Sequence, residues 1–272
     1  MIKLFRRIRN ELLSDNKFSQ PEQGGRAGKY LFYALGEIVL VVIGILIALS
    51  INNWNEDRKR GLAEKKYLTR LLVDLENDHE TLTFSKGLSE DRIDQINLLT
   101  DVIKDPSLSN ENSKQIIESI EKVTWRSYLP LSRIVYNELL NSGKMSLIQS
   151  EKLRELLSNY YGDADHWEMI LNLEDPQKEF SRATAGLLSI DILSAIENSS
   201  TLRNTKPKPF FDTEMKANDI IRIVQDLTVN REAIKWLPQI YHYHILAKKV
   251  ITNLSSQNEI LKEVVRIEIN KT

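Results

Sequence analysis

Residues 30–51 form one continuous apolar segment, YLFYALGEIVLVVIGILIALSI, whose single charged side chain is Glu37. As an α-helix this segment would extend about 33 Å, which matches a bilayer hydrocarbon core of about 30 Å. The segment therefore predicts one transmembrane helix. A cleaved signal peptide fits poorly, because the segment begins about thirty residues into the chain, exceeds an h-region of about 7–15 residues and is followed by no small-x-small cleavage site.

The charges that flank this segment predict its orientation. Residues 1–29 contain seven Lys or Arg residues and the twenty residues after the segment contain six, so the local counts nearly balance. Because a short N-terminal tail usually dominates insertion, we expect residues 1–29 in the cytoplasm and residues 52–272 on the outer side. The predicted location is the inner membrane of a Gram-negative bacterium, with the C-terminal domain in the periplasm.

The N-terminal tail has an amphipathic pattern of its own. Apolar residues recur at helical spacing from Ile2 to Leu12, and basic residues lie between them: Lys3, Arg6, Arg7 and Arg9. The pattern predicts a short helix that binds membrane lipid at the anionic cytoplasmic leaflet. The alternative is a charged tail that only fixes the topology. Residues 20–28 (QPEQGGRAG) predict a flexible joint before the span.

Glu37 requires an explanation, because a carboxylate in hydrocarbon costs a few kcal/mol on insertion scales. At 100° per residue, one stripe of the helix carries Tyr30, Glu37, Val41, Gly44 and Ala48. Gly44 and Ala48 form a small-xxx-small step, which lets a second helix approach closely. The stripe predicts a helix–helix contact, in a homo-oligomer or with a partner membrane protein, with Glu37 protonated or hydrogen-bonded across it. The alternative is that Glu37 snorkels to the membrane interface.

The sequence after the span predicts an all-α fold. Leu68, Leu75, Leu82, Ile96 and Ile103 follow a seven-residue grid that Ser89 interrupts, which predicts a long amphipathic helix over about 55–104 that Asp105-Pro106 ends. A second series, Ile240, Ala247, Leu254 and Leu261, predicts another long helix over about 238–269, with Pro238 in its first turn. We expect the span to continue into an elongated helical bundle in which these two long helices pack together.

Shorter helices are predicted between the two long ones. Their expected ranges are about 112–125, 131–142, 150–172, 177–196 and 214–234. Ser142-Gly143 is a C-terminal stop, Ser150 an N-cap and Pro176 a break between neighbouring helices. Residues 198–212 are the expected exposed loop. The domain organisation is thus a tail over 1–29, a span over 30–51 and an extracytoplasmic domain over 52–272.

Few residues point to catalysis. The chain has four His and no Cys, so disulfides and thiolate zinc sites are excluded, and a net charge of -1 without a large basic field indicates no nucleic-acid partner. His242 and His244 are two residues apart, which separates them by 200° on a helix and prevents joint metal chelation. Glu76-x-x-His79 and Asp163-x-x-His166 resemble the Glu-x-x-His spacing of bundle di-iron sites, but a partly buried His79 and a surface His166 are the simpler interpretation.

The aromatic residues allow two interpretations. Nine Trp and Tyr residues are numerous enough to line a ligand pocket, although core packing is their usual role: Trp125, Tyr128, Tyr136, Tyr160, Tyr161, Trp167, Trp236, Tyr241 and Tyr243. Nucleophile elbows, phosphate-binding Gly-rich loops and zinc signatures are absent from the sequence. We therefore predict no enzyme activity and no cofactor.

Three stretches carry a resemblance to a known family. The first extends over residues 28–56 and contains GKY (28–30), GEIVLVVIGILIAL (36–49) and NNWNE (52–56). The second is YNEL at residues 136–139, and the third is SGKMSLI at residues 142–148, followed by Leu153-Arg154. With the basic start of the chain, they resemble a family of Bacteroidota membrane proteins known only as a domain of unknown function. The resemblance implies a single-pass membrane protein and implies no activity.

Three function classes follow from these patterns. The first is a non-enzymatic inner-membrane protein whose periplasmic helical domain is an interaction or scaffold module of an envelope complex. The second is a sensor or small-ligand-binding module that signals through a partner membrane helix, because a tail of about 29 residues is too small for an output domain. The third and least favoured is a helical-bundle metalloenzyme.

Overall fold

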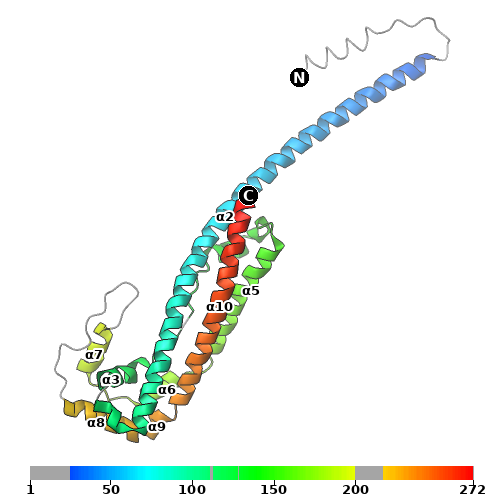
Figure 1. Ribbon diagram of the computed structural model, residues 1–272. Helices are drawn as coiled ribbons and strands as arrows, with labels where there is room; N and C mark the ends of the chain where they lie inside the picture. Colours follow the sequence, from blue (N-terminus) through cyan, green and yellow to red (C-terminus); the bar gives the residue numbers. More distant parts are fainter. Residues whose placement is uncertain (1–24, 111–112, 128, 200–216, 272) are drawn as a thin grey trace. The chain divides into compact units, whose positions relative to one another are not determined.

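The computed structural model describes residues 25–110, 113–127, 129–199 and 217–271. Within these ranges 86% of the structure is helical and there is no β-strand, which confirms the all-α prediction. The chain divides into two compact units, 1–60 and 61–272. Helix α2, Gly25–Lys104, supplies the described part of the first unit and continues into the second (Figure 1).

The other helices of the described ranges all belong to the second unit. In chain order they are η1 (Pro106–Asn110), α3 (Ser113–Lys122), α4 (Ile134–Asn141), η2 (Lys144–Leu147), α5 (Glu151–Leu171), α6 (Pro176–Ala183), α7 (Ile190–Ser199), α8 (Ala217–Val229), α9 (Arg231–Ile234) and α10 (Leu237–Lys271).

Three long helical segments form the main body of the second unit. The later part of α2 lies beside α10, and α5 packs against α10 (Figure 1). Side-chain contacts confirm the predicted packing of the two long helices: Lys248 Nζ lies 3.0 Å from Glu90 Oε1, and Asn258 Nδ2 donates a hydrogen bond of 3.0 Å to the Leu75 carbonyl. Since Glu90 follows Leu75 while Lys248 precedes Asn258, the two helices run antiparallel.

Two apolar cores fill this unit. The first core joins Leu68–Leu82 of α2 with α4, α5 and residues 243–265 of α10. The second core joins Ile96–Val102 of α2 with α3, α6, α7, α8, α9 and the start of α10. The residues of both predicted seven-residue grids are buried except Ile103, which is half-buried, so the apolar periodicity identified the core faces correctly.

Several predicted helix ends are confirmed. Helix α2 ends at Lys104, and the Asp105 carboxylate then accepts a hydrogen bond of 3.1 Å from the Ser107 N–H. The Ser150 hydroxyl caps α5 by accepting from the Leu153 N–H at 3.2 Å. Gly143 adopts a left-handed backbone with φ of 67° directly after α4, a conformation that glycine reaches without steric cost.

Two predicted helices are wrong as single elements. The predicted helix over 177–196 is interrupted between α6 and α7, where Gly186 has a φ of 87° that is incompatible with a continuing helix. The predicted helix over 214–234 is divided by Asn230, whose side chain accepts from the Ala233 N–H at 3.0 Å and caps α9. Most of the predicted loop over 198–212 lies outside the described residues, and its first two residues end α7.

The core assignment predicts unequal effects of two substitutions on neighbouring positions of α2. Leu75 is 0% exposed and Val73 is 58% exposed. Leu75→Ala should lower the free energy of unfolding by about 2–5 kcal/mol, because it leaves a cavity in the first core. Val73→Ala should change it by less than about 0.5 kcal/mol. Urea unfolding of the full chain in detergent, followed by tryptophan fluorescence, measures both; equal losses would contradict the assignment.

Candidate functional site

The apolar segment of α2 makes no contact that would bury it within the described residues. From Ala34 onward the helix contains a strongly apolar stretch that is 0% buried. Among the described residues, α2 is the one helix that is long and apolar enough to cross a membrane, and its apolar stretch lies near the N-terminus. Its full exposure distinguishes it from a core helix of the same hydropathy.

The residues of the predicted stripe lie on this exposed helix. Glu37, Val41, Gly44 and Ala48 are all exposed, and a Cβ added to Gly44 would meet no atom within 4 Å. The side chain of Tyr30 and the predicted basic residues Lys3, Arg6, Arg7 and Arg9 lie outside the described part of the structure. The helix–helix contact and the lipid-binding tail therefore stay predictions.

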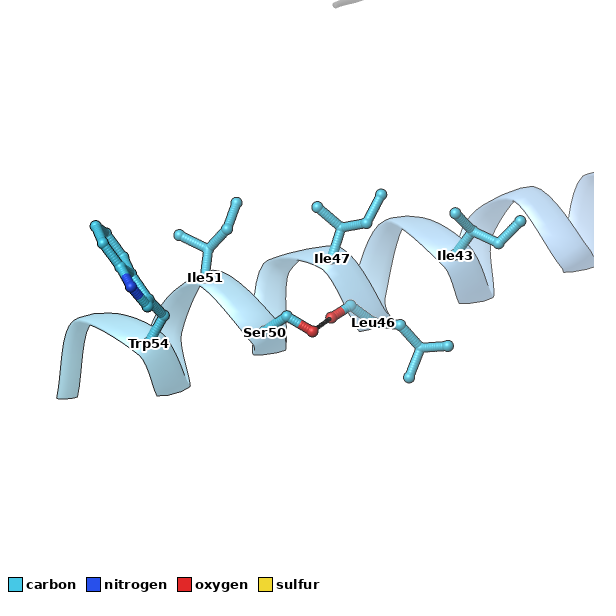
Figure 2. Close-up of a pocket in the computed structure, with 6 residues that line it drawn as sticks. All are labelled: Ile43, Leu46, Ile47, Ser50, Ile51 and Trp54. Atoms are coloured by element: carbon cyan, nitrogen blue, oxygen red, sulfur yellow. Dashed lines mark hydrogen bonds between the residues drawn. The ribbon is translucent and has the colours of Figure 1, made fainter. Parts of the chain in front are cut away.

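A different face of the same helix carries a shallow apolar groove of about 370 Å³. It is lined by Ile43, Leu46, Ile47, Ser50, Ile51 and Trp54, and Figure 2 shows the three isoleucines pointing to one side of the helix. The Ser50 hydroxyl donates a hydrogen bond of 2.8 Å to the Leu46 carbonyl, so this polar group is satisfied within the helix (Figure 2). At 100° per residue the groove lies about 120° from the predicted stripe.

Buried carboxylates of α2 hold the chain between α3 and α5. Asp78 accepts a hydrogen bond of 2.5 Å from the Ser132 N–H, and Asp74 accepts one of 2.9 Å from the Val135 N–H. Glu64 accepts one of 2.7 Å from the Gln149 N–H. Because the first N–H groups of a helix have no partner within it, Asp74 acts as a cap for α4 from a neighbouring helix. This role could not be predicted from the sequence, since acidic residues on a helix usually face water.

Asp78 is the centre of a buried hydrogen-bond network. Its other oxygen accepts from the Tyr160 hydroxyl at 3.1 Å, and Asn258 Nδ2 donates to the same hydroxyl oxygen at 3.3 Å. Burial raises the pKa of the Asp78 carboxyl to about 6, although the hydrogen bonds from Ser132 and Tyr160 oppose the rise. The network therefore contains a carboxyl group that changes charge near neutral pH.

A layer of polar side chains separates the two apolar cores. We call it the polar layer and define it by six buried residues: Ser85, Ser89 and Arg92 of α2, Ser127 before α4, Gln177 of α6 and His244 of α10. Between Leu82 and Ile96, the buried positions of α2 are these three polar residues alone. The interruption of the seven-residue grid at Ser89 was the sequence signal for this layer.

Hydrogen bonds and ring contacts connect the polar layer to its surroundings. Ser89 Oγ and Ser127 Oγ are 2.7 Å apart, and the Tyr243 hydroxyl donates to the Ser127 carbonyl at 2.7 Å. The guanidinium of Arg92 lies 5.2 Å from the centre of the Trp125 ring. Burial lowers the pKa of His244 to about 3, and the positive charges of Arg92 and Arg126 contribute to the fall.

The histidine patterns of the sequence do not form a metal site. His79 is partly buried and its Nδ1 lies 2.7 Å from Glu259 Oε1, while His166 is exposed, as predicted for both. Asp163 accepts a hydrogen bond of 2.8 Å from Gln257 rather than pairing with His166. Among the described residues, no three His, Cys, Asp or Glu side chains are grouped so that they could hold a metal ion.

Six of the aromatic residues named above pack in or against the apolar cores: Tyr160, Tyr161 and Tyr243 are buried, and Tyr136, Trp167 and Trp236 are partly buried. Tyr160 and Tyr161 are among the largest fully buried side chains, and the Tyr161 ring stacks on Tyr136 with ring centres 4.4 Å apart. Tyr241 is an exception because it is exposed, and Tyr128 lies outside the described residues. Core packing is therefore their main role.

Comparison with known families matches residues 37–187 to DUF6090, a family of unknown function. The match covers more than half of the chain. The chain belongs to the DUF6090 family. The part matched to DUF6090 begins within the apolar segment and extends beyond α6, so it includes Asp78, Tyr160 and Gln177, whereas α10 with His244 lies after it. No curated protein and no solved structure matches the chain.

The pKa of Asp78 predicts how stability depends on pH. In the folded chain Asp78 keeps its proton up to about pH 6, whereas its ordinary pKa is 3.8, so the folded state binds more protons between these values. The free energy of unfolding should therefore fall as pH rises through this window, by about 3 kcal/mol from this group. Asp78→Asn should remove that contribution. Urea unfolding of the full chain in detergent at about pH 3.5 and pH 7 compares the two proteins.

Tyr160→Phe provides the second variant for this test. It removes a hydrogen bond that stabilises the carboxylate form of Asp78, so the loss of stability should continue to a higher pH than in the unsubstituted chain. A pH dependence that is the same in Asp78→Asn and in the unsubstituted chain would contradict the assignment.

Proposed function

We propose that this DUF6090 protein is anchored in the bacterial inner membrane by residues 30–51 and that its helical domain, residues 52–272, is a periplasmic interaction module. The observation that carries the proposal is the apolar part of α2, which is long enough to cross a bilayer and is 0% buried. Exposing such a surface to water is unfavourable, and a bilayer removes that cost. The proposal assigns binding, and no catalysis, to the domain.

The uses of the buried polar groups support this assignment. One oxygen of each of the Glu64, Asp74 and Asp78 carboxylates accepts a hydrogen bond from a backbone N–H group of the same chain. They hold the segment between α3 and α5 against α2. A side chain engaged in this way stabilises the fold and is not available as a general base for a substrate.

We also propose that two copies of the chain associate through the stripe of Tyr30, Glu37, Val41, Gly44 and Ala48. Copies inserted in the same orientation are parallel, so a two-fold axis along the membrane normal brings identical residues together. Gly44 and Ala48 would allow close approach, and the two Glu37 carboxyl groups would hydrogen-bond to each other.

The membrane topology can be tested with single cysteines, because the chain contains no cysteine of its own. In spheroplasts, Ser256→Cys on the exposed face of α10 should react with a membrane-impermeant maleimide. Ser14→Cys in the tail should react only after the membrane is permeabilised. Both proteins should stay in the membrane fraction after an alkaline carbonate wash. Reaction of the tail cysteine alone would contradict the proposed orientation, and extraction by carbonate would contradict the anchor.

The proposed self-association predicts face-specific crosslinking. Gly44→Cys and Ala48→Cys should form disulfide-linked dimers in native membranes on mild oxidation, because the two copies of each residue would face one another. Val42→Cys and Leu46→Cys, on the opposite face, should form at most about one tenth as much dimer. Equal crosslinking on both faces would exclude this contact, and crosslinking to a different protein would replace the second copy with that partner.

A second candidate function is a ligand-binding module that signals through a partner membrane helix. The observation that favours it is the polar layer, in which Gln177 and His244 are buried without hydrogen-bond partners among the described residues. The layer contains residues of α2, the same helix that carries the apolar segment.

A further inference from the structure

The unpartnered polar atoms of the interior gather on two side chains. In the described part of the structure, seven buried side-chain nitrogen or oxygen atoms have no hydrogen-bond partner, and four of them belong to Gln177 and His244. Gln177 is 1% exposed and His244 is 0% exposed. The nitrogen and the oxygen of the Gln177 amide and both nitrogens of the His244 imidazole lack a hydrogen-bond partner. Buried polar groups in proteins normally have one.

Helix packing brings these two side chains toward the same region. Gln177 lies on α6 and His244 on α10, and these helices pack against each other. Arg126 connects the two elements: its Nη1 lies 3.0 Å from the Oδ1 of Asp175, the N-cap of α6, and its guanidinium lies 5.2 Å from the centre of the Tyr243 ring. The centres of the Tyr243 and His244 rings are 5.0 Å apart.

Arg92 of α2 supplies the guanidinium of the polar layer itself, whereas Arg126 lies beside the layer. The Arg92 side chain is 4% exposed, and its Nη1 donates to Asp91 at 2.6 Å and to Gln95 at 3.2 Å. Among the described residues, the hydrogen bonds that Arg92 makes use its Nη1, and its guanidinium lies against the Trp125 ring. Its positive charge, with that of Arg126, acts on the His244 imidazole, which stays neutral at pH 7 with one donor and one acceptor.

The groups that meet in the layer have one chemistry in common. Guanidinium groups bind carboxylate and phosphate oxygens through charge-assisted hydrogen bonds, often two at once. A neutral imidazole N–H and an amide NH₂ group donate to the same oxygens. Apolar side chains at positions 177 and 244 would satisfy the packing of the core without leaving polar atoms unpaired, so the polar residues indicate a use other than stability.

We propose that the polar layer binds a small molecule through a carboxylate or phosphate group. The positive charge of Arg92, and of Arg126 beside the layer, would stabilise that group, and His244 and Gln177 would complete its hydrogen bonds. This inference rests on the second candidate function and does not depend on the membrane anchor. The ligand is small because the six residues of the layer are all buried between the two cores.

The proposal is tested on the full chain in detergent micelles, with sodium phosphate and sodium succinate as probes against sodium chloride at equal ionic strength. We expect at least one probe, at roughly 50 mM, to raise the midpoint of thermal unfolding by at least about 4 °C. The same probe should also shift the imidazole ¹⁵N NMR signals of His244, which report on the site itself. These signals are assigned by removing the other three histidines one at a time.

Two variants and one control separate binding from a general salt effect. His244→Phe and Gln177→Leu should lose the response to the probe while keeping, without the probe, a midpoint at least equal to that of the unsubstituted chain. His242→Phe, which changes an exposed residue of α10, should keep the full response. A probe effect of the same size in all variants would overturn the proposal.

If the variants fail to fold, the His244 signals of the unsubstituted chain decide. Signals that do not move with either probe would also overturn the proposal. These measurements report on the second unit in micelles, so the absence of probe binding would not contradict the proposed membrane anchor. In the same way, a negative result of the topology experiment would not contradict this site.

Discussion

The change of apolar pattern along α2 is the constraint on which the rest of the structure depends. Over residues 34–51 the helix is predominantly apolar and exposed. Farther along α2, Leu68, Leu75 and Leu82 lie on one apolar face that is buried in the first core. A helix that is apolar all round needs a bilayer or a protein interior, and one with a single apolar face needs neighbouring helices. Helices α4, α5 and α10 supply those neighbours, so the order of the two patterns along α2 determines which part of the chain folds around it.

Polar groups then determine how the helices are placed on that apolar face. The buried carboxylates of α2 fix the segment between α3 and α5 through backbone N–H groups, which gives directional contacts that apolar packing lacks. The polar layer has the opposite effect, because Gln177 and His244 leave buried polar atoms unpaired. Two interior features of similar polarity therefore have different consequences. The carboxylates of Asp74 and Asp78 accept hydrogen bonds and stabilise the fold, whereas the polar layer carries a cost that a bound ligand would remove.

The sequence predicts the parts of the fold that depend on local pattern. Seven-residue grids located both long helices, and Ser150 and Gly143 located helix ends, because caps and glycine turns act within a few residues. The split at Asn230 was not predicted, although its cap to the Ala233 N–H is local. The Asn230 amide also donates to the Ala183 carbonyl at 2.8 Å, a contact between distant residues. For the candidate sites, the stripe that contains Glu37, Gly44 and Ala48 was predicted from helical geometry, and its role as a contact stays a prediction. The burial of Asp78 and His244 could not be predicted, because it depends on tertiary packing and not on a local sequence pattern.

The account combines a membrane-anchored α2 with a helical domain built on the later part of the same helix. Its central claim is that α2 is covered twice, by lipid over residues 34–51 and by the packed helices of the second unit from Leu68 onward. Hydrogen–deuterium exchange of the full chain in lipid nanodiscs tests this claim most directly. The account predicts strong protection of backbone amides in residues 34–51 and 68–104, with faster exchange in residues 52–60 between them. Rapid exchange throughout residues 34–51 in the presence of the bilayer would contradict it.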